Sequence, residues 1–432
     1  MHERALIRGH RRSRRIGIVV ALLALLVALA SCGGGQQAAS PTVGLPPPAT
    51  AANQPAPTAA PTAANPAPAA TPAAASATAG QPAAASPQST AFPMQGPHVG
   101  YGMNVWLPTA DQDRTLDLLT GAGFTWARQW ISWESVEPTP GAYNWTDLDA
   151  ITTAAQRHNV KLLVVFLRSP AWAEPNHGIP PDAKGKQAYA AMLAAVAQRY
   201  KGKIAAYEIW NEQNLAGETG GKVNAGEYVE LLKLAFPAVK KNDPGAFVLY
   251  GGLTPTGVND PSVAVDDTIY LQQTYDYQNG EVKQYFDALG AHVSGTLNPP
   301  DTLWPDKPGP GPGWQNDRSF YFRRVEDIRA VMEKNSDGAK QIWLTEFGWT
   351  TKNQAKGYEY GQYVTEDDQA KYLVGAYQLA EQQYPWMGVM FLWNLNFSTV
   401  SQPDDEKTPW SIVYADYSPR PAYIALKNMP KK

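Results

Sequence analysis

The sequence predicts an α/β fold that consists of a single (β/α)8 (TIM) barrel over residues 98–432. Two observations lead to this prediction: eight apolar, β-rich runs alternate with eight segments of helical period, and no Gly-x-Gly-x-x-Gly turn follows the first run. Such alternation indicates a parallel sheet with crossover helices. The roughly 330 residues available are in the range of one barrel. The alternative, a doubly wound open sheet, rarely needs so many units.

Continuous apolar runs such as residues 162–166 are expected where both faces of a strand are buried. The expected strands are residues 100–107, 125–131, 161–167, 204–210, 246–251, 288–293, 341–345 and 388–395. The helices expected to follow them are residues 111–119, 145–158, 184–200, 225–239, 268–285, 320–333, 367–383 and 421–427. The pattern of the sixth strand is the weakest.

The first 31 residues predict a lipoprotein signal peptide. Six arginines precede an apolar stretch over residues 16–30, which suits a signal peptide and is shorter than the roughly 20 residues of a membrane-spanning helix. Leu29-Ala30-Ser31-Cys32 resembles the bacterial lipobox, in which the cysteine is lipidated. The sequence therefore predicts an extracytoplasmic, cell-surface lipoprotein with its membrane anchor on Cys32. An uncleaved anchor and an ordinary signal peptide are the alternatives.

Residues 32–97 predict a disordered Ala/Pro/Thr-rich linker, because they contain no charged residue and few large apolar side chains to bury. Without residues 1–31, which hold six arginines and one glutamate, the net charge of -3 becomes -8. An acidic chain without a basic patch argues against nucleic-acid partners. The chain has one cysteine and six histidines, none at a metal-ligand spacing, so we expect no metal and no cofactor.

Two glutamates lie where expected strands end. The fourth strand leads into Trp210-Asn211-Glu212, and the seventh ends in Thr345-Glu346-Phe347. In a parallel barrel the carboxyl ends of the strands form the active site. Cleavage of a glycosidic bond needs two carboxyl groups there, one neutral and one ionised. An isolated glutamate at a strand end is more often a cap or a solvated charge, but two in aromatic surroundings favour this chemistry.

Four segments resemble clan A glycoside hydrolases, and one of them, residues 133–149, is similar to the corresponding segment of families 39, 42 and 5. Residues 210–214, Trp-Asn-Glu-Gln-Asn, are similar to the clan's Trp-Asn-Glu-Pro-Asn motif, with Gln213 in place of the proline. Residues 133–149 resemble the segment after the clan's second strand, residues 345–349 its nucleophile strand, and residues 418–423 the start of its last helix. The resemblance covers the whole domain after the linker and is specific to the clan rather than to one family.

The resemblance implies roles for individual residues. Glu212 corresponds to the general acid/base and Glu346 to the nucleophile that forms a covalent glycosyl-enzyme. Asn211 would bind the sugar 2-OH, and Arg128 would lie beside Glu346 and keep it ionised, since a nearby opposite charge favours the ionised form. Trp393 would form the floor under the sugar. The alternative for Trp393 is simple core packing, and the alternative for Arg128 is a surface ion pair.

The remaining substrate-binding candidates are His292, Trp172 and Trp349. His292 ends the sixth strand, where the clan often has a histidine or tyrosine, although Val293-Ser294 replace the aromatic residue that commonly follows. Trp172 and Trp349 lie in two of the three loops expected to shape the cleft, residues 169–184, 294–319 and 349–365. Aromatic rings pack on sugar faces, but many of these rings are expected to close the barrel instead.

The resulting hypothesis is a retaining hydrolase of β-linked oligo- or polysaccharides, with carboxyl groups about 5–5.5 Å apart. A non-catalytic carbohydrate-binding barrel on the cell surface is one alternative, and a transglycosylase that remodels exopolysaccharide is another. The sequence leaves open the sugar, the linkage and whether chain ends or interiors are attacked.

Overall fold

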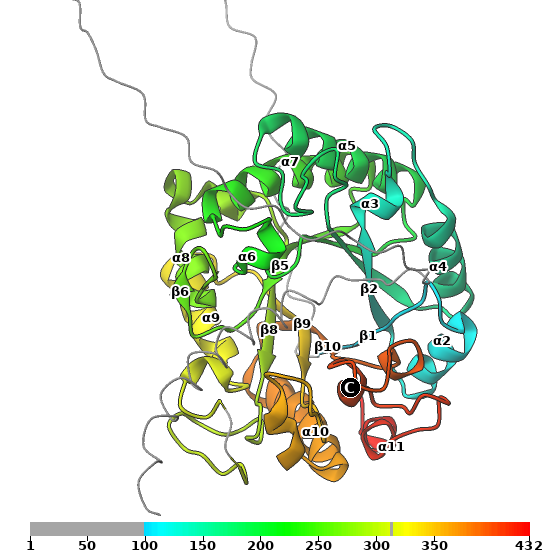
Figure 1. Ribbon diagram of the computed structural model, residues 1–432, viewed down its shortest axis with the longest axis vertical. Coiled ribbons are helices and arrows are strands. Elements are labelled where there is room, and N and C mark those ends of the chain that lie inside the picture. Colours follow the sequence, from blue (N-terminus) through cyan, green and yellow to red (C-terminus); the bar gives the residue numbers. More distant parts are fainter. Residues whose placement is uncertain (1–98, 312–313) are drawn as a thin grey trace, which may run out of the picture. The chain divides into compact units, whose positions relative to one another are not determined.

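The computed structural model describes residues 99–311 and 314–432; the expected signal peptide, Cys32 and the expected linker lie outside these residues. Within the described part, eight parallel strands close into a barrel in the order β1-β10-β9-β8-β5-β4-β3-β2 (Figure 1). The strands are β1 (Gly100–Asn104), β2 (Trp126–Ser132), β3 (Lys161–Leu167), β4 (Ala206–Ile209), β5 (Phe247–Leu253), β8 (Ala288–Ser294), β9 (Ile342–Gly348) and β10 (Met387–Leu392). The predicted (β/α)8 barrel is confirmed.

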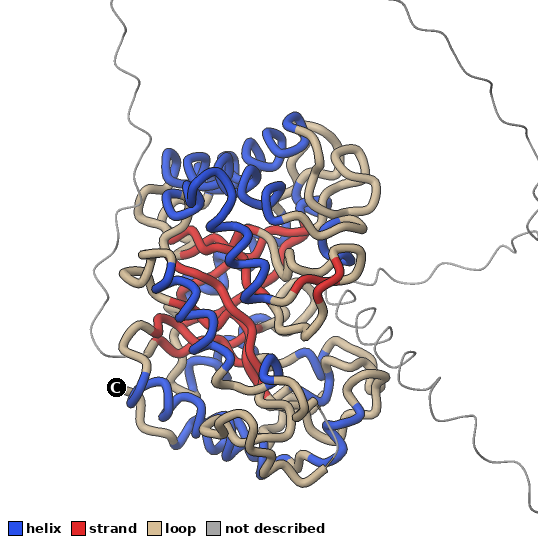
Figure 2. The backbone as a smooth tube through the Cα atoms, turned by 90° about the vertical axis from the view of Figure 1, so that its left-hand side faces the viewer, coloured by secondary structure: helices blue, strands red, loops and turns tan. Residues whose placement is uncertain are grey.

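Helices cover the outside of the barrel (Figure 2). The α-helices are α2 (Gln112–Gly121), α3 (Trp133–Val136), α4 (Thr146–Arg157), α5 (Ala183–Arg199), α6 (Ala216–Thr219), α7 (Ala225–Asn242), α8 (Asp267–Asp276), α9 (Arg324–Lys334), α10 (Glu366–Gln383) and α11 (Pro421–Asn428). Short polar side chains cap several of them: Thr365 and Asp368 form a reciprocal capping box at the start of α10. A small hairpin of β6 (Asn259–Asp260) and β7 (Ala264–Val265) is inserted after β5.

The single helix predicted over residues 268–285 is wrong. The α-helix α8 ends at Asp276, and the 3-10 segment η2 (Tyr277–Gln284) follows it. Gln278, Asn279 and Gly280 take positive φ values of 44°, 57° and 78°. Asn and Gly adopt this left-handed backbone at little cost, so the Gln-Asn-Gly run interrupts the helix. The same run is the sequence signal that could have predicted the break.

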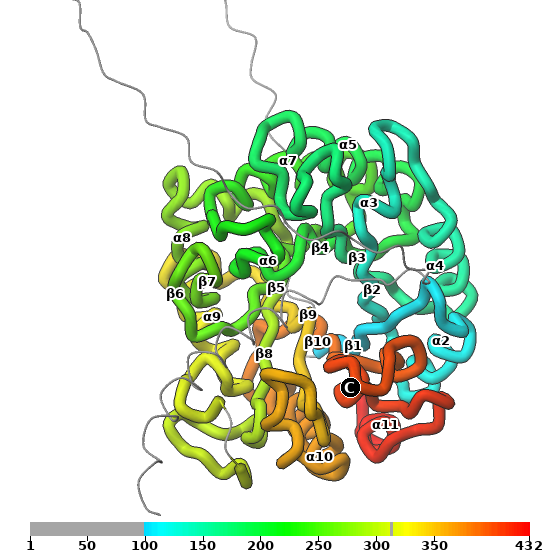
Figure 3. The backbone as a smooth tube through the Cα atoms, in the orientation of Figure 1, coloured from blue at the N-terminus to red at the C-terminus, as the bar shows by residue number. Residues whose placement is uncertain are grey.

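The first and last elements of the barrel lie side by side (Figure 3). Strand β1 pairs with β10, with Gly102 opposite Phe391, and the Tyr423 hydroxyl of α11 donates to the carbonyl of Leu118 in α2 at 2.9 Å. This junction closes the barrel, so the strand ends form one continuous mouth. None of the helices in the described residues is long and apolar enough to cross a membrane.

The interior of the barrel is apolar towards the amino-terminal ends of the strands. One cluster collects the inward side chains at that end: Trp126, Leu163, Ala206, Leu249, Ala288, Trp343, Val389 and Phe391. Side chains two residues apart on a strand share a face, so Arg128 follows Trp126 inward and Glu208 follows Ala206. Both are completely buried. A polar layer therefore lies directly above the apolar plug, towards the carboxyl ends of the strands.

Candidate active site

Glu346 reaches the interior because β9 has an irregular register. His292 of β8 pairs with Glu346, whereas the preceding Ala291 pairs with Leu344, so Thr345 is skipped. Trp343 points inward, and regular alternation would turn Glu346 outward. An irregularity of this kind re-aims a side chain and is common beside active sites. The shifted register therefore brings Glu346 into the mouth of the barrel.

Arg128 organises the polar layer. Its Nη1 donates to Oε1 of Glu346 at 2.6 Å, and its Nε donates to Oε2 of Glu208, also at 2.6 Å. Further donations reach Oδ1 of Asn104 at 2.8 Å and Oδ1 of Asn211 at 2.9 Å. The planar guanidinium suits such multiple fixed contacts. Arg128 lies beside Glu346, where the resemblance placed it. The hydrogen bond from Arg128 also fixes the side-chain amide of Asn211, with Oδ1 directed towards Arg128.

Glu212 follows β4 on a backbone of unusual shape. Trp210 and Glu212 have positive φ values of 68° and 45°. The Glu212 amide donates to the carbonyl of Gly252 at 2.9 Å, and the Gly252 amide donates to Oε1 of Glu208 at 2.9 Å. A Cβ on Gly252 would lie 2.3 Å from Nε2 of His292 and 2.5 Å from Oγ1 of Thr345. Only glycine leaves room for these contacts.

His292 connects the two glutamates. Its Nδ1 lies 2.9 Å from Oε1 of Glu212, and its Nε2 lies 3.8 Å from Oε1 of Glu346. One oxygen of Glu212, one of Glu346 and one ring nitrogen of His292 all lie within 4.8 Å of one another. The sequence motifs thus meet at one point. Three such groups could hold a cation, but Arg128 already supplies a positive charge to Glu346.

Burial dominates the titration of the site. It raises the pKa of Glu212 to about 7, and the hydroxyl of Thr254 and the charge of Arg128 oppose the rise. Burial also raises the pKa of Glu346, against the electrostatic interactions with His292 and Arg128. The pKa of His292 is lowered, again by burial, which favours its neutral form. Glu346 has the ion pair that Glu212 lacks, so the two carboxyl groups are suited to opposite protonation states.

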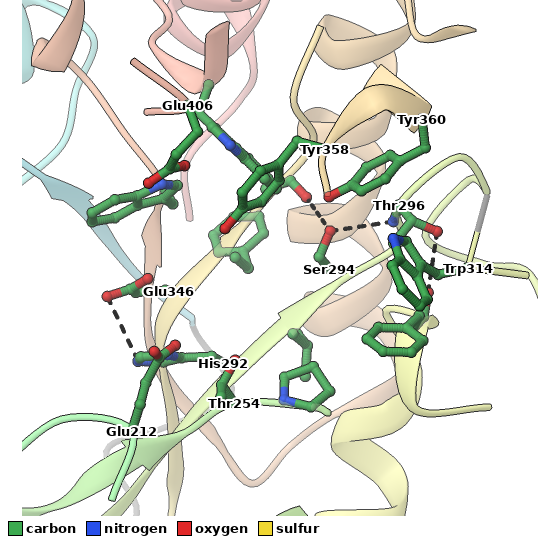
Figure 4. A pocket seen from close by; sticks show the side chains of 17 residues that line it. Glu212, Thr254, His292, Ser294, Thr296, Trp314, Glu346, Tyr358, Tyr360 and Glu406 are labelled. Atoms are coloured by element: carbon green, nitrogen blue, oxygen red, sulfur yellow. Dashed lines mark hydrogen bonds and ion pairs between the residues drawn. The ribbon is translucent and has the colours of Figure 1, made fainter. Parts of the chain in front are cut away.

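The two glutamates and His292 line one cavity, which encloses about 740 Å³ including the part open to solvent. Figure 4 shows them at one end, with Tyr360 and Trp314 at the other and Tyr358 between. The other lining residues are Thr254, Pro255, Val293, Ser294, Thr296, Phe320, Phe347, Gly348, Trp393, Glu406 and Trp410. They come from the ends of β8 and β9 and from the loops after β5, β8 and β10, so segments far apart in the chain build the wall.

The tryptophans expected to bind substrate have different surroundings. Trp393 lines the cavity and stacks on Trp130 with 4.8 Å between the ring centroids. Trp349 is fully buried, and its Nε1 donates to the carbonyl of Asn298 at 2.9 Å. An indole without exposed surface cannot stack on a sugar, which corrects the expectation for Trp349. Trp172 is 37% exposed and lies outside the cavity lining.

Sequence reasoning missed several participants. Asn104 ends β1 and accepts from Arg128, while its own Nδ2 donates to the carbonyl of Thr345 at 2.9 Å. Glu406 and Trp410, in the loop after β10, line the cavity. The signal for Asn104 was a polar amide side chain within the otherwise apolar run of residues 100–107. The loop over residues 396–420 has no periodicity, so nothing local indicated its inward side chains.

The fold and its paired carboxyl groups define the class of (β/α)8-barrel glycosyl hydrolases. Within this class, the model of the cellulase family, glycosyl hydrolase family 5, matches residues 81–397. The chain belongs to this family.

Curated relatives match a shorter part of the chain. The endo-1,4-beta-xylanase 3 of Hypocrea jecorina (strain QM6a) is 30% identical over 124 residues, which are 27% of this chain and 34% of the relative. The endo-1,4-beta-xylanase A of Humicola insolens is 31% identical over 129 residues, 27% of this chain and 32% of the relative. The matched part thus spans about a third of the length of these relatives.

Solved structures share the fold. A family 39 glycoside hydrolase from Bacteroides cellulosilyticus WH2 superposes with a TM-score of 0.58 at 24% identity, covering 77% of this chain and 63% of that one. Xylanase 10B from Thermotoga petrophila RKU-1, in complex with xylobiose, gives a TM-score of 0.51 at 14% identity and covers 77% and 94% of the two chains. At these identities the likeness concerns the barrel alone.

Proposed function

We propose that the protein is a retaining glycoside hydrolase that cleaves β-linked oligo- or polysaccharides by double displacement through a covalent glycosyl-enzyme. The observation that carries the proposal is the approach of Glu212 and Glu346, with one carboxyl oxygen of each within 4.8 Å of the other. Retaining enzymes place their carboxyl groups about 5–5.5 Å apart, whereas inverting enzymes leave about 6.5–9.5 Å for a water molecule.

In the first step Glu212 is the acid and Glu346 the nucleophile. A neutral His292 with its proton on Nδ1 donates to Oε1 of Glu212, which leaves Oε2 to carry the acid proton. That proton passes to the glycosidic oxygen as the bond to the anomeric carbon breaks, and a carboxylate oxygen of Glu346 bonds to that carbon. The ion pair with Arg128 favours the ionised form of Glu346 that attacks, against the burial that raises its pKa.

In the second step Glu212, now ionised, takes a proton from a water molecule, and that water displaces Glu346 from the anomeric carbon. Two inversions give net retention. The amide of Asn211, oriented by Arg128, binds the sugar 2-OH, and Trp393 offers a ring face below the sugar. Two of the relatives are endo-1,4-beta-xylanases, so β-1,4-xylan is the first substrate to try.

The test is hydrolysis of aryl β-glycosides and β-linked polysaccharides by the wild type, Glu212→Gln and Glu346→Gln. We expect turnover by the wild type alone, and NMR of the first product is expected to show the β-anomer. An α-anomer as the first product would refute retention. A wild type that binds sugars without turnover would favour the binding barrel, and transfer to added sugar acceptors in excess of hydrolysis would favour the transglycosylase.

We also propose that the protein is an extracytoplasmic, cell-surface lipoprotein anchored through Cys32. The support is the lipobox-like Leu29-Ala30-Ser31-Cys32, in which the only cysteine of the chain occupies the lipidated position. Metabolic labelling with an alkyne fatty acid is expected to mark the wild type and not Cys32→Ser. Equal labelling of both proteins would contradict the anchor.

A further inference from the structure

A third carboxyl group lines the cavity beside the two of the mechanism. Glu406 follows β10 and η5 (Phe397–Thr399), and Figure 4 shows its carboxyl group directed into the cavity on the side of Glu346. The double displacement leaves this group without a role. We propose that Glu406 accepts hydrogen bonds from hydroxyl groups of the bound sugar and that the cavity thereby selects an uncharged sugar over a uronic acid. The inference rests on the proposed function and specifies its substrate class.

The backbone around Glu406 is fixed from two sides. Nδ2 of Asn353, in the loop after β9, donates to the carbonyl of Glu406 at 3.0 Å. Nδ2 of Asn394, just after β10, donates to the carbonyl of Lys407 at 3.2 Å. Both asparagines are buried, and Oδ1 of Asn394 accepts from the Ser411 hydroxyl at 2.7 Å. A binding group held by such supporting contacts needs little ordering when a ligand arrives.

Lys407, a charged partner of Glu406, is not among the lining residues. Nζ of Lys407 lies 3.3 Å from Oε1 of Glu406 and 3.1 Å from Oδ1 of Asp405. Lys407 is therefore shared between two carboxylates and is absent from the lining of the cavity. A purely structural ion pair is the competing explanation for Glu406. It predicts that Glu406 affects stability and has no effect on which sugar is bound.

The charge of the cavity favours uncharged ligands. Its 17 described lining residues include three glutamates and no lysine or arginine, and burial lowers the pKa of His292, the one lining imidazole. A uronate would enter this cavity without a cation to pair with, which is a repulsive element of specificity. Burial raises the pKa of Glu406 to about 7, so its carboxyl group is ionised, and adds to the repulsion, above that pH. The ionised carboxylate has only acceptors, to which sugar hydroxyls can donate, and the sugars are therefore compared at pH 8.

The experiment compares aryl β-glycosides that share one leaving group and differ only in the sugar, the preferred neutral sugar and its uronic acid. Glu406→Gln keeps the shape and removes the charge; Asp404→Asn, an exposed carboxylate of the same loop, is the matched control. For Glu406→Gln we expect kcat/KM on the neutral sugar to fall about 10- to 100-fold, mainly through KM. The ratio of kcat/KM on the neutral sugar to kcat/KM on the uronide should fall at least about tenfold. Asp404→Asn should change neither.

Two results would overturn the inference while leaving the hydrolase intact: a wild type that cleaves the uronide as well as the neutral sugar, or a Glu406→Gln variant with a lower Tm and unchanged KM and preference. If Glu406→Gln does not fold, Glu406→Asp retains the charge and should weaken neutral-sugar binding while still rejecting uronides. A wild type without turnover would contradict the proposed function instead. Calorimetric binding of neutral and uronic oligosaccharides to the wild type and Glu406→Gln would then decide the role of Glu406.

Discussion

The Nη1 atom of Arg128 lies 2.6 Å from Oε1 of Glu346, and the same guanidinium donates from Nε to Glu208 at 2.6 Å. Arg128 is fully buried between these two carboxylates. One cation therefore compensates both a carboxylate proposed to react and one that only supports the site. Neither carboxylate can lose this partner without leaving an uncompensated buried charge, which is costly.

Arg128→Met is expected to lower the free energy of unfolding by about 3–5 kcal/mol and kcat/KM by about 10²–10³-fold. Arg128→Lys keeps the charge but cannot reach all four acceptors from one ammonium, so we expect an intermediate loss of activity. Urea unfolding and steady-state kinetics measure the two quantities. Arg128→Met with wild-type activity would show that Glu346 does not depend on this ion pair.

The pH profile should report the proton on Glu212. Since burial raises its pKa to about 7, kcat/KM is expected to fall above about pH 7 as the acid loses its proton. In Glu212→Ala, assayed with a dinitrophenyl leaving group that needs no acid, the fall should disappear. Glu406→Gln is the control, because Glu406 also has a pKa raised to about 7. A fall that disappears in Glu406→Gln and persists in Glu212→Ala would show that the loss of activity above pH 7 comes from Glu406 and not from Glu212.

The same pKa predicts a stability gain for Glu212→Gln. The folded chain holds this proton up to about pH 7, and the unfolded chain releases it near 4.5. The folded state thus binds more protons, so stability falls as pH rises from 4.5 towards 7 and the cost persists above that. Glu212→Gln removes the cost. We expect its Tm to exceed that of the wild type by about 1–3 °C at pH 8 and to match it at pH 4. A higher Tm of Glu212→Gln at pH 4 together with an unchanged Tm at pH 8 would contradict the raised pKa of Glu212.

Three tryptophan variants separate binding from packing. Trp393→Ala is expected to reduce kcat/KM about 10- to 100-fold, because its ring lines the cavity proposed to hold the sugar and stacks on Trp130. Trp349→Phe should lower the free energy of unfolding by about 1–3 kcal/mol, since the carbonyl of Asn298 loses its donor, without changing KM. Trp172→Ala should leave hydrolysis of small aryl glycosides unchanged. A raised KM in Trp349→Phe would contradict the burial of that ring.

Gly252→Ala tests the close packing behind the glutamates. The added Cβ would meet Nε2 of His292 at 2.3 Å, so His292 must move away from Glu212. Overpacking of this kind costs about 1–3 kcal/mol, and we expect a clear loss of kcat together with an altered pH profile. Gly245→Ala is the control, because its nearest neighbour atom would lie 3.9 Å away. Equal kinetics of both variants would show that the contact is not needed.

Much of the fold was predictable because its determinants are local. Each of the eight expected strands overlaps an observed one, since continuous apolar runs are unambiguous where both faces are buried. The helix over residues 268–285 failed at a Gln-Asn-Gly run, where backbone preference overrode helical period. Strand ends also differed: the first strand stops at Asn104, three residues early, because the turn of the chain there depends on contacts with Gln129 and Asn396.

The sequence by itself determined the barrel and the two motif glutamates, because strand periodicity and the residues around Glu212 and Glu346 are contiguous in the chain. Only the tertiary structure decided which side chains face the cavity and how they titrate. The irregular register that turns Glu346 inward depends on pairing with two neighbouring strands, and the pKa of Glu212 depends on burial by distant segments. Trp349 and Trp393 both follow a barrel strand and both are buried, but of the two Trp393 alone lines the cavity. Glu406 lines the cavity on a loop without periodicity, and Asn353 and Asn394 hold the backbone of that loop. Burial, interatomic distance and strand register depend on residues that are remote from one another in the chain, so no local sequence pattern specifies these properties.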